Sequence, residues 1–398
     1  MKKIRLGDIA TLITKGTTPT TIGFSFVDTG VNFVKIESIS ENGEFLSDKF
    51  AHITDECDNK LKRSQLEEND ILFSIAGAIG RTAIVPRSIL PANTNQALAI
   101  IRIPRNAINL RFVLYALQSQ AVEEQSEKQK QGVAQLNLSL KNIADILIPL
   151  VLSEKQDEIV RNLAAVDTAI AIRKEQIRLI DQVVKSRFIE LFGDPEKNPK
   201  GWPVVNITEI IGGKVSNGFF AKREAYRDDG NMQVLGVANI VNRMYSNIES
   251  LPRTNATQAD EAKYAVKYGD MLFCRSSLVA EGIGKASIVP KGAPHNVLFE
   301  CHVIRLPLDL QKCIPEFVQV LSTTDFFRRQ IIAQSKTATM TTIGQDGILK
   351  SMIILPPIEQ QREFLRFVEQ TDKSKLAVQK GLQELEILKK SLMQQYFG

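Results

Sequence analysis

The most constraining feature of the sequence is an internal repeat. Residues 154–193 align without a gap with residues 359–398, at an offset of 205, and the identical pairs include Phe192 and Phe397. Upstream, residues 69–74 recur as 269–274, and residues 80–86 recur as 284–290. Because this offset is far longer than the roughly 20–50 residues of a solenoid repeat, each copy is interpreted as a whole domain followed by a trailing segment.

Both trailing segments are predicted to be long amphipathic helices. From Ser153 to Leu191 the chain contains no Gly or Pro, and its apolar residues recur at steps of three, four or seven, which is typical of one helix face. The predicted pairing residues are Ile159, Leu163, Val166, Ile170, Ile177, Ile180 and Val184 in the first copy, and Phe364, Val368, Leu382, Leu385, Leu388 and Leu392 in the second. At about 1.5 Å per residue, a helix of about 38 residues is about 57 Å long. An apolar stripe of that length needs a partner, so we expect the two helices to pair as an antiparallel coiled coil.

The segments before the helices have a different pattern. Short β-rich runs such as residues 71–75 and 303–306 are separated by Gly, Asn and Pro, and helical patterns follow near residues 110–120 and 315–332. The predicted fold class is therefore α+β, with two tandem domains that are each followed by a long helix. The expected segments are a first domain at 1–152, a central helix at 153–193, a linker and second domain at 194–357, and a C-terminal helix at 358–398.

Composition restricts the partners and the compartment. The chain has 50 Lys and Arg against 45 Asp and Glu, a net charge of +5 that allows an acidic partner without requiring one. No apolar run approaches the roughly 20 residues of a membrane span, and the first residues lack the apolar core of a signal peptide, so a cytoplasmic protein without membrane contact is expected. The four cysteines (Cys57, Cys274, Cys301 and Cys313) include no Cys-x-x-Cys pair, which argues against a disulfide framework and a zinc site.

We find no catalytic machinery in the sequence. Residues 282–286 resemble part of a phosphate-binding loop, but its first Gly would fall at Val279, and Ala286 stands where Ser or Thr must hold magnesium. Glu261-Ala262-Lys263 has the Glu-x-Lys form of a nuclease metal site, a pattern short enough to arise by chance. The three histidines have no metal-ligand spacing. No metal is therefore predicted, and three alternatives stay open: a DNA-binding subunit, a helical scaffold without sequence-specific DNA binding, and a metal-dependent nuclease that uses Glu261.

Four stretches in order resemble the specificity subunit of type I restriction-modification systems, over essentially the whole chain. They are ITKGTTP with GVNFVKI (13–19 and 30–36), DILFS with GR and NQ (70–74, 80–81 and 95–96), IPL with EKQDEIV (148–150 and 154–160), and LFGDP with NPKGWP (191–195 and 198–203). One departure is that the Pro pair at 356–357 has no equivalent before the first helix, which predicts a slightly different angle between the first domain and its helix.

This resemblance implies a non-catalytic subunit with two target recognition domains, each of which reads one half of a split double-stranded DNA sequence. It also implies that the paired helices dock two methyltransferase subunits, which bring S-adenosylmethionine and methylate adenine, and that restriction subunits join the complex for cleavage. This chain itself then needs no cofactor. A helix of about 57 Å predicts half-sites centred between one and two duplex turns apart, at about 34 Å per turn.

Candidate DNA-contacting residues lie in loops beside the repeated strands, because Arg, Lys, Asn and Gln read base edges while other basic and hydroxyl residues contact phosphate. They are Lys15, Lys35, Ser74, Arg81, Asn95 and Gln96 in the first domain, and Lys222, Arg223, Arg275, Ser276, Lys285, Asn296 and His302 in the second. Arg81 and Lys285 occupy matching turns, which favours phosphate contact over base reading. The Asn95-Gln96 pair has no counterpart in the second domain and could instead close a loop, and Lys222-Arg223 could be a solvated pair.

Overall fold

The protein is described here by a computed structural model that covers residues 2–104, 108–129 and 137–398. The chain divides into two compact units: unit 1 comprises residues 1–174 and 380–398, and unit 2 comprises residues 175–379. Each unit therefore contains one β-rich domain, the start of one long helix and the end of the other.

Unit 1 is built on a four-stranded antiparallel sheet in the order β2-β8-β5-β6. Its strands are β2 (Leu12–Lys15), β5 (Ile71–Ser74), β6 (Thr82–Ile84) and β8 (Leu98–Arg102). A second sheet, in the order β4-β3-β7, contains β3 (Val31–Val34), β4 (Ala51–Ile53) and β7 (Ala92–Thr94). Strand β5 is buried at every position because Ile71 and Phe73 face one hydrophobic core while Leu72 faces another. This two-sided burial explains why β5 reads as a continuous apolar run.

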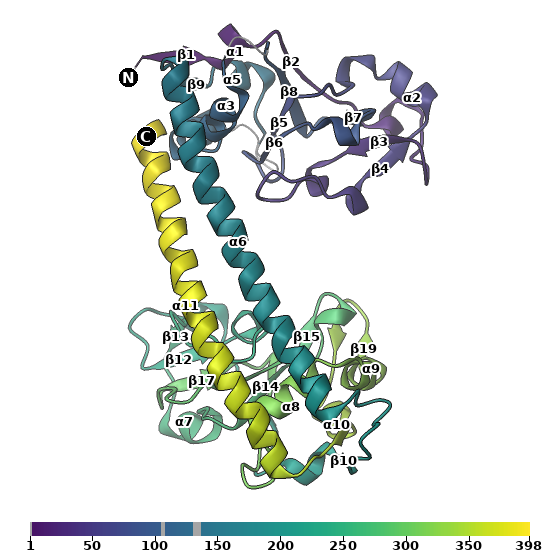
Figure 1. The fold of residues 1–398 in the computed structure, drawn as a ribbon, viewed down its shortest axis with the longest axis vertical. Helices are drawn as coiled ribbons and strands as arrows, with labels where there is room; N and C mark the ends of the chain where they lie inside the picture. The colour runs from purple at the N-terminus through teal and green to yellow at the C-terminus, as the bar shows by residue number, and fades with distance from the viewer. Residues whose placement is uncertain (1, 105–107, 130–136) are drawn as a thin grey trace. The chain divides into compact units, whose positions relative to one another are not determined.

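Short helices and a strand pair complete the first domain. The helices are α1 (Leu6–Ile9), α2 (Asp55–Lys60), α3 (Leu110–Leu117), α4 (Gln120–Gln129) and α5 (Leu140–Ala144), and β1 (Lys3–Arg5) pairs with β9 (Leu147–Pro149). The side chain of Asn109 caps the first turn of α3 by accepting from the backbone N–H groups of Arg111 and Phe112. Figure 1 shows β1, β9 and α3 close to the start of α6 (Ser153–Phe192), the first long helix.

Unit 2 repeats this frame. Its main sheet has the order β11-β18-β14-β16, formed by β11 (Ser216–Asn217), β14 (Asp270–Cys274), β16 (Ala286–Ile288) and β18 (Val303–Pro307). The remaining matching elements are β10 (Val204–Asn206), β12 (Met232–Leu235), β13 (Arg253–Thr254), β17 (Val297–Phe299), β21 (Met352–Ile354), α7 (Gln258–Tyr264), α8 (Pro315–Ser322), α9 (Asp325–Ala333) and α10 (Gln345–Leu349). The predicted α+β class with two tandem domains is confirmed.

Unit 2 also contains a small additional sheet in the order β15-β20-β19, formed by β15 (Ser276–Ser277), β19 (Lys336–Thr337) and β20 (Thr341–Thr342). The described part of unit 1 has a single bridge between Ala76 and Asn137 at this place. The sheet exists because the segment after β14 is longer in the second copy: five residues separate Ser74 from Gly80, whereas nine separate Cys274 from Gly284.

Strand register corrects one part of the sequence alignment. Ile71 lies opposite Ile101 in unit 1, and Met271, at the matching position of β14, lies opposite Leu306 in unit 2. The similar runs IRIP at 101–104 and IRLP at 304–307 suggest that Arg102 and Arg305 are equivalent, but the strand register displaces this match by two residues, so they are not. Arg102 binds a carboxylate in unit 1, whereas Arg305 donates to backbone carbonyl oxygens in unit 2.

The two long helices, α6 and α11 (Ile358–Phe397), run antiparallel within each unit. In unit 1, Asp167 pairs with Lys389 at 2.6 Å and Lys174 with Glu386 at 3.7 Å. In unit 2, Asp181 pairs with Lys375 at 2.5 Å and Arg187 with Glu363 at 3.0 Å. Residue numbers rise along one helix as they fall along the other, so the predicted antiparallel pairing is confirmed.

The residues predicted to pair the helices are buried or half-buried, with one exception. The buried members are Ile159, Leu163, Val166, Val184, Phe364 and Val368, and the half-buried ones are Ile170, Ile177, Ile180, Leu382, Leu385 and Leu392. Leu388 is 45% exposed, so its assignment to helix pairing is wrong. The steps from Leu382 to Leu385 and Leu388 are three and three, which turns the third residue away from a stripe that advances by three and four. Lys389 takes the position on the α6 side instead and binds Asp167.

Aromatic rings anchor the C-terminal end of each long helix at matching positions. Phe397 of α11 lies 5.3 Å from Phe112 of α3 between ring centroids, and Phe192 of α6 lies 4.8 Å from Phe317 of α8. Phe188 adds a second ring in unit 2, 5.4 Å from Phe317. All of these rings are buried and share the main core of their unit with the first turns of the other long helix.

A buried glutamine in each copy fastens the start of the long helix to the same domain. The Gln156 Oε1 atom accepts from the backbone N–H of Asn109 at 2.9 Å, and its Nε2 donates to the carbonyl of Val151 at 2.9 Å. Gln361, at the matching position, accepts from the N–H of Ile314 at 2.9 Å and donates to the carbonyl of Pro356 at 2.7 Å. Repetition of these contacts shows that both domains hold their helices in the same way.

The buried aspartates before β5 and β14 have different partners. Asp70 accepts from Arg102 Nε at 2.7 Å and from Nη2 at 2.8 Å. Asp270 accepts from the backbone N–H of Lys267 at 3.0 Å but has no such fork, and burial raises the pKa of the Asp270 carboxyl despite the attraction of Arg305.

We expect Phe397→Ala to lower the free energy of unfolding of unit 1 by about 3–5 kcal/mol, because a deleted buried ring leaves a cavity. Hydrogen exchange of peptides from α3 and β8 would measure this loss, with the exposed Gln394→Ala as the control. Unit 2 should be unaffected, as reported by the fluorescence of Trp202, the only tryptophan. Unchanged exchange in α3 would contradict the anchoring role.

Asp270→Asn and Asp70→Asn should change stability in opposite directions at pH 7. Asp270 with its raised pKa disfavours the folded state once ionised, so Asp270→Asn should stabilise unit 2 by about 1 kcal/mol. This gain should shrink as the pH falls from the folded-state pKa toward the ordinary value, because the native carboxyl then becomes protonated. Asp70→Asn should cost about 2 kcal/mol, since Arg102 loses its charged acceptor. Hydrogen exchange of β5 and β14 between pH 4 and pH 7 measures both effects, and equal signs would refute the argument.

Candidate nucleic-acid interface

Three predicted residues of the first domain meet at one edge of its main sheet. Strand β2 ends at Lys15, and the turn between β7 and β8 carries Asn95 and Gln96. The N–H of Gly16 donates to the carbonyl of Asn95 at 3.1 Å, and a Cβ atom at Gly16 would lie 1.8 Å from a carbonyl oxygen in β7, so this approach requires glycine. The Thr18 hydroxyl donates to the side-chain oxygen of Gln96. Lys15 and Gln96 are exposed there.

The other candidates of the first domain have structural partners. Ser74 is fully buried and donates to the carbonyl of Ala76 at 2.9 Å, so its prediction as a DNA contact is wrong. The ammonium of Lys35 lies 4.5 Å from the ring centre of Phe26. Asn95 Oδ1 accepts from the N–H two residues further on, at 3.1 Å, which is the loop-closing alternative.

Arg81 and Lys285 hold equivalent turns. Arg81 Nη1 donates to the carbonyls of Ile36 and Ile39, at 3.2 and 2.9 Å. Lys285 Nζ donates to Oδ1 of Asn242 at 2.8 Å, which fixes the corresponding turn of unit 2. The cationic groups of Arg81 and Lys285 therefore stabilise these turns through hydrogen bonds within the protein.

In the second domain, Arg275, Ser276 and His302 come together at the end of β14. The N–H of Arg275 donates to the carbonyl of His302 at 2.8 Å, and its Nη1 donates to the carbonyl of Cys301 at 3.2 Å. The Ser276 hydroxyl lies 3.0 Å from Nδ1 of His302. This cluster occupies the same edge of the sheet as Lys15 and the Asn95 turn in unit 1.

The structure places Lys222 and Arg223 at a different end of the sheet from Asn296. Lys222 and Arg223 are exposed and follow closely after Phe219, whose backbone bridges to Glu300 beside the cluster. Asn296 lies before β17, whereas Glu300 follows it, so Asn296 is at the opposite end of that strand. Its side chain donates to a backbone carbonyl of the neighbouring segment at 3.4 Å, and its grouping with Arg275 and His302 is not supported.

A hydroxyl-rich surface that the sequence motifs did not predict lies beside this cluster. The additional sheet exposes Lys336, Thr337 and Thr342 next to Ser276 and Ser277. The signal that could have identified it is the run SKTATMTT at residues 335–342, which carries five hydroxyl groups and one lysine. Hydroxyl and ammonium groups are typical phosphate and base-edge contacts.

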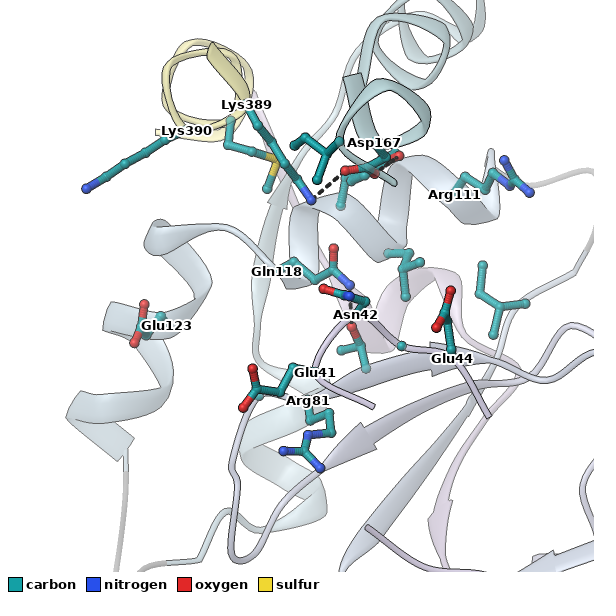
Figure 2. A pocket seen from close by; sticks show the side chains of 18 of the residues that line it. Glu41, Asn42, Glu44, Arg81, Arg111, Gln118, Glu123, Asp167, Lys389 and Lys390 are labelled. Carbon is teal, nitrogen blue, oxygen red and sulfur yellow. Dashed lines mark hydrogen bonds and ion pairs between the residues drawn. The ribbon is translucent and has the colours of Figure 1, made fainter. Parts of the chain in front are cut away.

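A groove of about 2270 Å³ opens in unit 1 between the β-rich domain and the two helices (Figure 2). Its lining includes eight carboxylates and seven cationic side chains. Lys389 and Tyr115 both bind the Asp167 carboxylate, with the tyrosine hydroxyl at 2.7 Å; burial, together with this bond, raises the pKa of Tyr115. Because its charges are balanced, this groove suits a protein segment better than the DNA polyanion.

Among the described residues, those considered for metal binding or nuclease activity do not form a metal site. Glu261 is half-buried on α7 and borders a shallow hollow of about 410 Å³ with Lys267 and His295. In residues 2–104, 108–129 and 137–398, no group of three or more His, Cys, Asp or Glu side chains is placed to hold a metal ion. Within the same residues, no helix is both long and apolar enough to cross a membrane. The four cysteines are unpaired.

Comparison with known proteins supports the resemblance seen in the sequence. The family model of the type I restriction modification DNA specificity domain matches twice, over residues 1–182 and 199–387. The EcoBI specificity subunit of Escherichia coli is 35% identical over 136 residues, which cover 34% of this chain and only 28% of that subunit. The MjaIX specificity subunit of Methanocaldococcus jannaschii is 21% identical over 86% of this chain and 80% of its own length.

Two solved structures share the fold. One comes from a study of complex assembly and conformational transition of the type I R-M system. Its chain is 17% identical in sequence to this one, with a TM-score of 0.52 over 100% of this chain and 97% of that chain. The other, the type I restriction-modification S subunit from M. genitalium, is 13% identical, with a TM-score of 0.50 over 100% of this chain and 96% of that one.

Proposed function

Because the chain belongs to the family of type I restriction-modification DNA specificity domains, we propose that it is the sequence-reading subunit of such a complex, with each domain binding one half of a split double-stranded target. The observation that carries this proposal is the difference between two otherwise matching sheet edges. Unit 1 presents Lys15 and Gln96 there, and unit 2 presents Arg275, Ser276 and His302. A repeated frame with different polar side chains at one edge suits the reading of two different half-sequences.

The long helices offer a surface for partner subunits. On α6, Ile172, Leu179 and Val183 are exposed and recur at steps of seven and four, so they form one apolar face. On α11, Leu376 and Ile387 are 65% and 69% exposed. Exposed apolar residues in register along a helix are typical of a protein interface. We infer that two methyltransferase subunits dock on these helices.

The chemistry is assigned to the partners. The methyltransferase subunits would bring S-adenosylmethionine and methylate adenine in the bound sequence, and restriction subunits would join for cleavage. The role of this chain is to bind and orient the DNA, a task that needs side chains held in place rather than a nucleophile or a proton donor.

Co-expression with the methyltransferase subunit and modified-base sequencing of host DNA tests DNA reading. We expect a split adenine-methylated motif with a fixed gap, absent without this chain. Combined Arg275→Ala and His302→Ala should weaken the reading of one half about ten-fold or more, because base-edge bonds contribute about 1–3 kcal/mol each. Lys214→Ala, an exposed cation at the far end of the sheet, is the control.

Two results would redirect the assignment. A complex that forms but leaves no new mark would favour a helical scaffold. Metal-dependent cleavage by the purified chain that is lost in Glu261→Ala would favour a nuclease.

Docking on the helices predicts that Ile387→Asp removes the methyltransferase subunit from the purified complex, because a charge replaces an exposed apolar contact. Leu152→Asp, which changes a leucine that is 81% exposed before the first turn of α6, should have no effect. Co-purification and size-exclusion chromatography measure both variants. Retention of the partner by Ile387→Asp at wild-type levels would place the interface elsewhere.

A further inference from the structure

The two copies of the frame differ most clearly in the loop that follows β14. The four additional residues of the second copy create a projecting segment that includes Leu278 and Val279, which are 82% and 58% exposed. The shorter loop of unit 1, residues 75–79, has no exposed leucine or valine. Two large apolar side chains at this exposure contribute little to the stability of the domain, which points to an intermolecular contact.

Hydrogen bonds hold the loop in one conformation. The Ser277 hydroxyl accepts from the N–H of Val279 at 3.3 Å, and Arg328 Nη2 on α9 donates to the carbonyl of Glu281 at 3.1 Å. Gly284 closes the loop at φ +62°, and a Cβ atom there would lie 2.4 Å from the Ile331 side chain. A side chain presented by a fixed loop loses less conformational entropy on binding than one on a flexible loop.

The chemistry around the loop favours a nucleic acid over an apolar protein surface. Arg275 and His302 flank its start, and the exposed Lys336 and the hydroxyls of Ser276 and Thr337 lie on the adjoining sheet. Against these groups, the loop itself carries one carboxylate, Glu281.

A half-buried cation, Arg328, lies behind the loop as well. Burial lowers the pKa of the Arg328 guanidinium, and its Nη1 atom has no hydrogen-bond partner among the described residues. The apolar tip thus lies close to Arg275, Lys336 and several hydroxyl groups, which are residue types that contact phosphate and base edges.

We propose that the Leu278–Val279 tip enters the major groove of the half-site bound by the second domain and that Leu278 contacts the 5-methyl group of a thymine. The inference rests on the proposed function, because it requires the second domain to bind DNA. The thymine methyl is exposed only in the major groove, and an apolar side chain against it distinguishes thymine from cytosine. The neighbouring hydroxyls and Arg275 then hold the backbone and the adjacent bases. Leu278 is therefore a specificity-determining residue that unit 1 lacks.

Deoxyuridine substitution tests this contact, since it removes the thymine methyl without changing the hydrogen-bonding groups. With the full chain in complex with its methyltransferase subunit, each thymine of the second half-site is replaced in turn, and DNA affinity is measured. We expect one position at which the replacement weakens wild-type binding about four-fold, the value of one buried methyl-sized group. Leu278→Ala should bind the thymine DNA about as weakly as wild type binds the deoxyuridine DNA, and should not respond to the substitution.

Matched variants separate the contact from general damage. Leu278→Met retains an apolar side chain and should keep the sensitivity to deoxyuridine. Leu310→Ala changes another exposed leucine, next to Gly269 at the opposite end of β14, and should also keep it. Trp202 fluorescence reports that each variant of unit 2 is folded.

The possible failures are distinguishable. If the wild-type complex methylates a split motif but no thymine in the second half responds, or that half has no thymine, the contact is refuted and the proposed function stands. If Leu278→Ala loses the methyltransferase subunit, the tip is a protein contact and the inference is overturned. If the wild-type complex reads no motif, both the inference and the proposed function fall.

Discussion

The architecture depends on a pair of aromatic contacts, because each domain completes its core with residues from two different helices. Phe397 packs on Phe112 in unit 1, and Phe192 packs on Phe317 in unit 2. The start of the other helix enters the same core and is fastened by a buried glutamine. Neither domain can bury its apolar surface without the helix that belongs to the other copy. This explains why the helical segments, including their last phenylalanine and glycine, are the parts of the two copies that match best.

The sheet edges are free of this constraint. Both units use the same strand order and the same close glycine approach, at Gly16 and Gly218, to bring two loops together. Core packing determines where those loops lie but not which polar side chains they carry. At this edge, unit 2 has a longer loop and a small additional sheet, whereas unit 1 has an amide pair in a short turn. A common frame with two different edges is the arrangement that independent half-site reading requires.

The cations of the frame show how tertiary contacts select among chemically similar residues. Arg81, Lys285 and Arg102 have the charge of a phosphate contact, yet each is held by protein acceptors. A half-buried cation needs acceptors, and the carbonyls of a tight turn or a buried carboxylate supply them. At the strand ends, Lys15 is exposed, whereas Arg275 is half-buried and donates through Nη1 to the carbonyl of Cys301.

Much of the fold follows from the sequence alone. The repeat, the helix pattern and the short β-rich runs predicted two α+β domains with antiparallel helices, because an apolar stripe of period 3.6 cannot stay in water. Periodicity does not determine the phase of one helix against another, which is why Leu388 was assigned to a position that Lys389 occupies. The displacement by two residues at Arg102 and Arg305 has a similar cause, since only the register between strands decides which positions are equivalent.

For the candidate interface, the sequence determined which side chains can bind DNA, and the tertiary structure decided which are available to do so. Arg275 and Ser276 are far from His302 in the chain, but they meet it because β14 and β18 are hydrogen-bonded neighbours. Ser74 has the same hydroxyl as Ser276, yet it is enclosed by the core and bonded to its own loop. Residue type defines the chemistry of a side chain, whereas burial and backbone hydrogen bonding, which depend on the whole fold, determine whether that chemistry can reach a partner.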